Sequence, residues 1–166
     1  ISLAGKEASG TGCIKLMMNG ALTIGTLDGA NVEMLDAVGK ENMFIFGLTS
    51  SEVEELWLRG YRSADYYANN ERLGRILSAL SVGFGGEAFS GIAGYLLNGH
   101  GVADPYMCLA DFESYRMTHQ SAVTQYRDRT AWTRMSLLNT AHSGFFAADR
   151  SIREYADRIW KLKPVQ

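Results

Sequence analysis

The sequence predicts an α/β protein: the C-terminal part of a Rossmann-like domain, followed by C-terminal helices. Two short apolar stretches, 21–26 and 43–46, flank a helical segment, and from residue 50 onward apolar residues recur at helical spacing. The chain has 166 residues, of which 46% are hydrophobic, so it is long enough for one domain-sized core. Because a two-stranded sheet is marginal by itself, we expect further strands from sequence upstream.

Residues 1–48 are expected to form a glycine-rich loop and a βαβ unit. The expected elements are, in order, a short helix from about Thr11 to Asn19, a strand over 21–26, a helix over 30–38 and a strand over 43–46. The strands of such a unit run parallel, and its crossover is right-handed.

Residues 49–166 are expected to be mainly helical. The first predicted helix begins with a Ser51–Glu54 capping box and ends at Gly60, and the next helices are predicted over 65–80 and 92–97. Asp111 is predicted to cap a helix whose inward residues are Phe112, Tyr115, Ala122, Val123 and Tyr126. The last two helices are predicted over 130–141 and over 152–160, the latter with a Ser151–Glu154 capping box. The aromatic stripes of these helices are interpreted as packing surfaces.

The opening run combines a glycine-rich turn with a lysine. Gly10-Thr11-Gly12 precedes a predicted helix, and Lys15 follows Thr11 by four positions, about one turn on and on the same face. The first turn of a helix has unpartnered N–H groups and the positive end of the helix dipole, so it attracts phosphate. A phosphate turn beside a lysine amine is what a pyridoxal phosphate site needs.

Other readings of this run remain open on spacing alone. The third glycine of a dinucleotide fingerprint is replaced by Lys15, and a P-loop would need Ser or Thr where Leu16 stands. A flexible loop with a surface lysine fits the spacing equally well. The pattern therefore indicates an anion site without naming the anion.

The amino-acid sequence of this run resembles the cofactor segment of the α-glucan phosphorylases, the family of glycogen, starch and maltodextrin phosphorylases. The similarity covers essentially the whole chain. The segments that carry it are Glu7 to Lys15, Asn19 to Glu33, Asn42 to Gly47, Arg59-Gly60-Tyr61, Trp132-Thr133-Arg134, Asp149 to Ile152 and Ile159-Trp160. Cys13-Ile14 stands where the family usually has Asn-Met, and the stretch 83–103 also departs from the family pattern.

The resemblance implies a role for each residue of the run. Lys15 would hold pyridoxal 5'-phosphate covalently, and Thr11 and Gly12 would contact its phosphate through backbone N–H groups; Lys15 and Thr11 are the candidate catalytic residues. The positions that match the sugar-contacting segment are Glu7, Ala8, Ser9 and Gly10. Glu7 could alternatively belong to a glycosidase carboxylate pair, but no second acid can be identified.

The resemblance also implies a reaction and its partners. Inorganic phosphate would cleave the terminal unit of an α-1,4-glucan and release glucose 1-phosphate with retained configuration. The family architecture is a two-domain glycosyltransferase of the GT-B type, so the whole chain, 1–166, would be part of its C-terminal, cofactor-binding domain. Because the chain begins at Ile1, just before the motif, we interpret it as the C-terminal piece of a longer enzyme, expected to be a cytoplasmic homodimer.

Composition excludes several other classes of function. A net charge of −2 gives no basic field for nucleic acid or anionic membranes, and no apolar run approaches the ~20 residues that span a bilayer. Cys13 and Cys108 lack metal-ligand or disulfide spacing, so no metal site is expected, and the three histidines are interpreted as ordinary surface or core residues. A transaminase-like enzyme would need a carboxylate and an arginine that cannot be located. A binding module without catalysis is the remaining rival.

Overall fold

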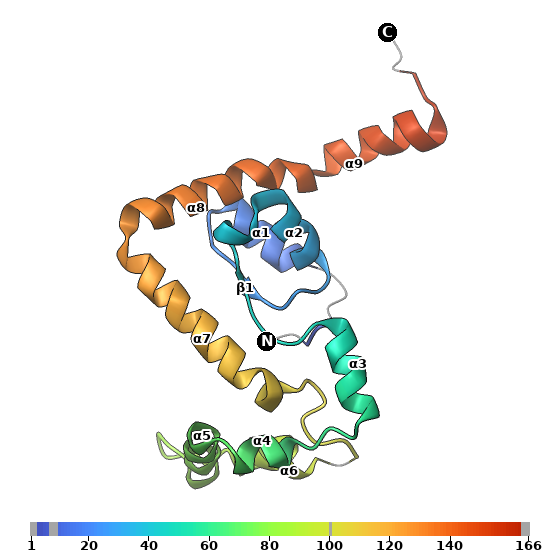
Figure 1. Ribbon diagram of the computed structural model, residues 1–166. Coiled ribbons are helices and arrows are strands. Elements are labelled where there is room, and N and C mark those ends of the chain that lie inside the picture. The colour runs from blue at the N-terminus through green and yellow to red at the C-terminus, as the bar shows by residue number, and fades with distance from the viewer. Residues whose placement is uncertain (1–2, 7–9, 100, 164–166) are drawn as a thin grey trace.

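The computed structural model describes residues 3–6, 10–99 and 101–163. Figure 1 shows two groups of elements, and α7 (Cys108–Arg127) runs along one side between them. The upper group contains the sheet, α1, α2 and α8, and the lower group contains α3 to α6. None of the helices in the described residues is long and apolar enough to cross a membrane.

The sheet of the upper group is a parallel pair. β1 (Ile24–Gly25) pairs with β2 (Phe44–Ile45), and α2 (Ala30–Val38) and the 3₁₀ turn η1 (Lys40–Asn42) connect them. The predicted parallel strand–helix–strand order is confirmed, and the predicted bounds of α2 are those observed. Each strand has only two residues, fewer than predicted. Each strand has one neighbouring strand in the described part of the chain, so its length is set by the hydrogen bonds between these two strands alone.

Three helices pack around this pair, and the first two of them, with the turn that follows the third, share one apolar core. They are α1 (Thr11–Met18), α2 and α8 (Arg129–His142), and the 3₁₀ turn η2 (Ser143–Phe146) follows α8. The buried residues of this core are Met17, Met34, Val38 and Met43, with Cys13, Ile14, Leu35, Ala37, Ile45 and Phe146 packed against them. The short helix predicted before Asn19 is therefore present and anchored.

The lower group corrects one predicted helix. The helices are α3 (Ser50–Leu58), α4 (Ser63–Ala68), α5 (Glu71–Val82) and α6 (Ser90–Asn98). The prediction of a single helix over 65–80 is wrong, because the helix is interrupted at Asn69 and Asn70. The side-chain oxygen of Asn70 accepts from the backbone N–H groups of Arg72 and Leu73, which starts a new helix.

The capping box of α3 lies two residues earlier than predicted. Thr49 is the N-cap; its hydroxyl accepts from the Glu52 N–H, and the Glu52 carboxylate accepts from the Thr49 N–H at 2.7 Å. Ser51 and Glu54, the predicted pair, lie within the helix. Two S/T-x-x-E patterns overlap here, and the helix begins at the first.

α7 begins before its predicted cap. Asp104 caps it, because its carboxylate accepts from the N–H groups of Cys108 and Leu109 at 2.9 and 2.8 Å. Asp111 lies in the first turn of α7 instead, buried, where it accepts from the Leu48 N–H at 2.9 Å. Ala122 is buried as predicted, whereas Val123 and Tyr126, predicted to face inward, are exposed.

The last helix also differs from its prediction. α9 (Ala148–Glu154) begins before Ser151 and continues as a π-helical turn, η3 (Tyr155–Trp160). Ser151 is thus inside the helix, and its N–H donates to the Ala147 carbonyl, so the predicted capping box is wrong. No residue of α9 or η3 is buried, and Figure 1 shows them extending away from the sheet.

Candidate functional site

The N-terminal turn of α1 begins at Gly10. Gly10 is the N-cap, and the first hydrogen bond of the helix runs from the Ile14 N–H to the Gly10 carbonyl at 2.9 Å. The N–H groups that precede this bond, including those of Gly12 and Cys13, are not used inside the helix. Together with the helix dipole, they give this turn a positive potential suited to an anion.

Lys15 lies one turn further along the same exposed face. Thr11, Gly12 and Lys15 are exposed, whereas Met17 is buried in the core of the upper group. The side-chain amide of Asn19 donates to the Lys15 carbonyl at 2.8 Å. The core therefore fixes α1 on one side and leaves a primary amine and the anion turn accessible on the other.

A second helix start contacts this turn. Gly10 is buried, and a Cβ added there would lie 2.1 Å from the Cβ of Ala30, the first residue of α2. Only glycine allows this close approach. The N-terminal ends of α1 and α2 thus meet, which places the positive ends of two helix dipoles together.

Asn31 follows Ala30 in α2 and was not singled out from the sequence. It is 8% exposed, and its side-chain N–H donates to the Thr26 carbonyl, just after β1, at 2.9 Å. Its Oδ1 is buried and has no hydrogen-bond partner among the described residues. The signal that could have revealed it is a polar residue at the second position of a helix that follows a buried strand.

The structure brings together four of the predicted site residues. Gly10 is the N-cap of α1, Thr11 and Gly12 are its first two residues, and Lys15 lies one turn further on, as the spacing predicts. Glu7, Ala8 and Ser9 lie outside the described residues, so the sugar-contacting role of this segment stays a prediction.

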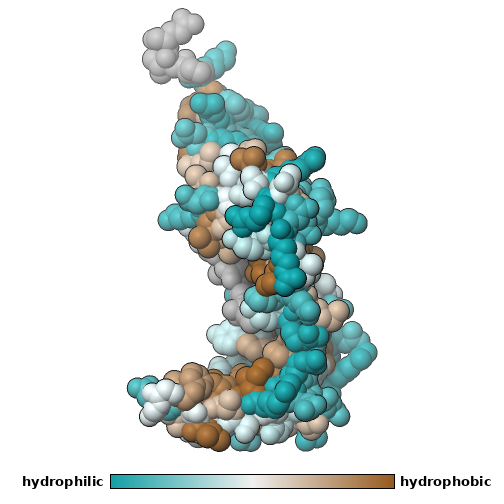
Figure 2. All heavy atoms as spheres, turned by 90° about the vertical axis from the view of Figure 1, so that its left-hand side faces the viewer, coloured by the Kyte–Doolittle hydropathy of each residue, from teal (hydrophilic) through white to brown (hydrophobic). Residues whose placement is uncertain are grey.

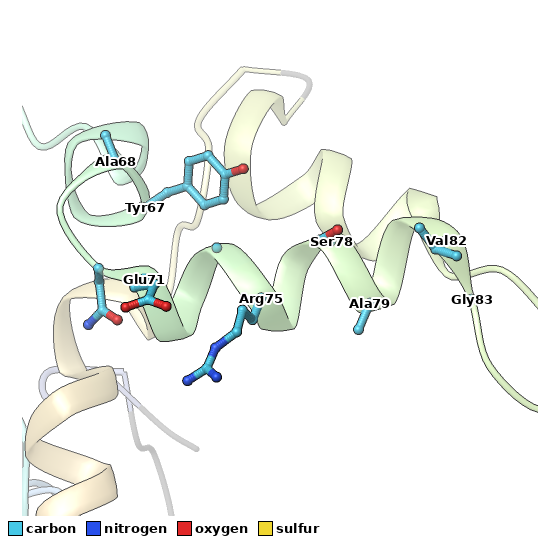
Figure 3. A pocket seen from close by; sticks show the side chains of 10 residues that line it. Tyr67, Ala68, Glu71, Arg75, Ser78, Ala79, Val82 and Gly83 are labelled. Carbon is cyan, nitrogen blue, oxygen red and sulfur yellow. The ribbon is translucent and has the colours of Figure 1, made fainter.

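A hollow of the described residues lies elsewhere, along α5. It has a volume of about 790 Å³, and its lining includes the small residues Gly74, Ser78 and Ala79. Figure 3 shows that the side chains of Tyr67, Glu71 and Arg75 spread away from one another instead of converging on a point. α5 lies at the opposite end of the molecule from α1 (Figure 1). This hollow therefore does not compete with the α1 turn as a reactive site.

The most perturbed ionisable groups belong to the start of α7. The Tyr61 hydroxyl donates to the Asp104 carboxylate at 2.7 Å, and burial, followed by that hydrogen bond, raises the pKa of the phenol. Burial also raises the pKa of the Asp111 carboxyl and of the Cys108 thiol. They surround the carboxylate of Asp104, which caps α7, and the contact of Asp111 with Leu48. The described residues contain no cluster of three or more His, Cys, Asp or Glu side chains arranged to hold a metal ion.

Comparison with known proteins decides the family. The model of the carbohydrate phosphorylase family matches residues 1–162. The chain belongs to this family. The resemblance carried by the opening run and the later segments is therefore confirmed.

Curated phosphorylases match over the full length of the chain. Identity is 47% over 165 residues to the glycogen phosphorylase of Synechocystis, 46% over 166 residues to that of Haemophilus influenzae, and 43% over 168 residues to the human muscle form. These alignments cover 99–100% of this chain but 19–20% of the relatives. The chain thus spans about a fifth of the length of the curated phosphorylases that it matches.

Proposed function

We propose that the chain is the cofactor-holding part of a glycogen or related α-glucan phosphorylase. The reaction is phosphorolysis, in which inorganic phosphate cleaves a terminal α-1,4-glucosyl unit and yields glucose 1-phosphate. The observation that carries the proposal is the common exposed face of α1, which presents both the anion turn at Gly10-Thr11-Gly12 and the Lys15 amine. The whole-chain similarity to proteins named glycogen phosphorylase supports the same reaction.

The residues fit pyridoxal 5'-phosphate. A phosphate ester suits the joined N-terminal ends of α1 and α2, and an amine one helical turn away suits a carbonyl-bearing ring. In this assignment Thr11 and Gly12 bind the phosphate through backbone N–H groups, and Lys15 holds the cofactor covalently. When bound, the cofactor supplies a phosphate group that exchanges a proton with the substrate phosphate.

The remaining roles divide between this chain and sequence outside it. Glu7, Ala8, Ser9 and Gly10 contact the sugar hydroxyls in this proposal. Because Thr11, Gly12 and Lys15 are exposed among the described residues, we place the other wall of the site in sequence outside residues 1–166. Bringing two phosphates together also requires cations, and we place those upstream.

In keeping with the family, the full-length protein is proposed to be a GT-B-type, cytoplasmic homodimer. Residues 1–48 would form the cofactor loop and βαβ unit, and residues 49–166 a helical part.

The first test locates the cofactor in the full-length protein. After incubation with pyridoxal 5'-phosphate, borohydride reduction and peptide mapping should place the pyridoxyl group on Lys15. Lys15→Ala should lose the adduct and retain little cofactor after dialysis. Lys40→Ala, which removes an exposed lysine from the same group of elements, is the matched control and should keep both.

A second measurement separates the proposed enzyme from a binding module. The full-length protein should release glucose 1-phosphate from an α-glucan and phosphate, and comparing glycogen, starch and maltodextrin will identify the preferred glucan. An adduct on another lysine would contradict the site. Cofactor on Lys15 without phosphorolysis of any of the three glucans would favour the binding module.

A further inference from the structure

Asn31 connects the sheet to the place where α1 and α2 meet. Its side-chain N–H donates to the Thr26 carbonyl, and its own backbone N–H donates to the Asp28 carbonyl at 3.1 Å. One residue thus ties the start of α2 to the chain that leaves β1. Its neighbour in sequence, Ala30, makes the contact with Gly10.

The amide of Asn31 lies tightly against β1. A Cβ added at Gly25 would lie 2.6 Å from the Asn31 Nδ2, so no side chain fits between them. Gly25 is itself fixed, because its carbonyl accepts from the Phe46 N–H, beside β2, at 3.0 Å. The position of the amide is therefore set by the sheet.

This position is transmitted to the anion turn. Since Ala30 and Gly10 approach too closely for any added atom, a shift of the start of α2 toward Gly10 has to displace the N-terminal turn of α1. Phosphate recognition by backbone N–H groups depends on their placement to within about half an ångström. The Thr11 and Gly12 N–H groups thus depend on the anchor at Asn31.

An asparagine at position 31 lowers the stability of the fold through its side-chain oxygen. Its Oδ1 is buried without a partner among the described residues, and such an oxygen is destabilising. The reverse amide orientation would set Oδ1 against the Thr26 carbonyl, so the donor is fixed toward Thr26. A leucine of similar volume would avoid the unpaired oxygen but would lose the link to Thr26. We propose that Asn31 is a positioning residue that holds the α1 turn in register for the cofactor phosphate, a role that rests on the proposed function.

Asn139 provides a matched control. It is also buried, its side-chain N–H donates to a backbone carbonyl, that of Asn42, at 2.8 Å, and its Oδ1 is likewise buried without a partner among the described residues. It lies in α8, and its partner Asn42 is the last residue of η1, which follows α2, so the contact is not with the Gly10 turn. Asn31→Ala and Asn139→Ala therefore each remove a buried side-chain amide and its hydrogen bond to a backbone carbonyl of another segment, at different places in the fold. Asn139 also donates to the Met135 carbonyl of its own helix at 3.0 Å.

The experiment measures affinity for two probes, pyridoxal 5'-phosphate and pyridoxal, in the full-length protein stripped of cofactor. Asn31→Ala should weaken binding of the phosphate ester about tenfold while changing pyridoxal binding by less than about threefold. Asn139→Ala should change neither by more than about threefold. A purely structural role predicts equal losses for both probes, or the same losses in both variants, and either result would overturn the proposal.

A second pair of variants tests the link if Asn31→Ala does not fold. Gly10→Ala should weaken pyridoxal 5'-phosphate binding, and Gly10→Ala/Ala30→Gly should recover most of it, because the exchange removes the 2.1 Å contact. Failure of the double variant to recover affinity would show that the α1–α2 contact does not transmit position. If the parent protein takes up no cofactor on Lys15, the proposed function itself fails, an outcome distinct from these.

Discussion

Asp111 is a charged residue that the fold places in an unusual position. One carboxylate oxygen accepts from the Leu48 N–H, and the other is buried without a partner in the described part of the chain, against Gly47. Gly47 has a positive φ of 82°, and a Cβ there would lie 2.7 Å from Oδ2. The residue thus joins the turn after β2 to the start of α7. Burial is the main reason that the pKa of its carboxyl is raised.

This raised pKa predicts a pH dependence of local stability. A folded-state pKa above the unfolded value means that the folded state binds the proton more tightly. The contribution of Asp111 to stability is therefore greatest below the unfolded pKa of about 4 and is lost as the pH rises through the raised pKa.

Asp111→Asn should remove that dependence. The variant keeps an oxygen for the Leu48 N–H but no longer has a charge to bury. At pH 7, amide exchange of Leu48 in the full-length protein should be no faster than in the parent. The difference between variant and parent should vanish as the pH approaches 4. Faster exchange in the variant at pH 7, with no difference near pH 4, would contradict this expectation and show that the charge stabilises this turn.

At the scale of elements, caps decide the helix boundaries that apolar spacing leaves open. Tyr66, Leu73 and Leu77 follow one helical phase, which predicts a single helix, yet α4 and α5 are separate. The Asn70 side chain both caps α5 and donates to the Glu113 carboxylate of α7 at 2.9 Å. That contact spans 43 residues, so local sequence does not reveal it.

The shifted capping box of α3 gives a sharp comparison of two substitutions. Thr49→Ala removes the hydroxyl that accepts from the Glu52 N–H and should lower the opening free energy of α3 by about 1 kcal/mol. Ser51→Ala, at the position predicted from sequence, should change it by less than about 0.5 kcal/mol.

Hydrogen exchange of the α3 amides in the full-length protein measures both effects. Equal changes in the two variants, or a larger change for Ser51→Ala, would contradict the observed cap. The comparison is well controlled because both substitutions remove one hydroxyl within the same turn.

At the scale of the whole molecule, apolar side chains lie on the surface in groups. Figure 2 shows them gathered at the lower end, where α5 and α6 lie. Val82 is 80% exposed and Phe84 is 61% exposed in this region. On the extended C-terminal segment, Ile159 is 66% exposed and Trp160 is 55% exposed. Surfaces of this kind are typical of contacts with further protein.

We therefore expect residues 1–166, expressed alone, to be inactive and poorly folded. The apolar side chains would remain in water, and β1 and β2 would each present an unpaired edge. Thermal unfolding should be broad, aggregation should increase with concentration, and no glucose 1-phosphate should form with pyridoxal 5'-phosphate added. A soluble monomer with a sharp unfolding transition and phosphorolysis would contradict this expectation, and the full-length protein is the positive control.

The sequence by itself determined the glycine turn at the start of α1, the lysine one turn away, the parallel strand–helix–strand order and the family. Each of these depends on local spacing or on a run of letters: Thr11 and Lys15 share a face because the helical repeat is 3.6 residues. Glycine at position 10 was readable as part of a turn, but not as a contact with Ala30. The proposed roles of Glu7, Ala8 and Ser9 rest on resemblance alone.

Only the tertiary structure decided which polar residues anchor these elements. Asn31 and Asp111 bind backbone groups outside their own helices, and Asn70 reaches a carboxylate in another helix. Their hydrogen bonds depend on how the chain folds back on itself, whereas periodicity reports only which side of a helix is apolar. A buried polar group has to find its partner wherever packing places one, and that is a property of the assembled core and not of the sequence window around it.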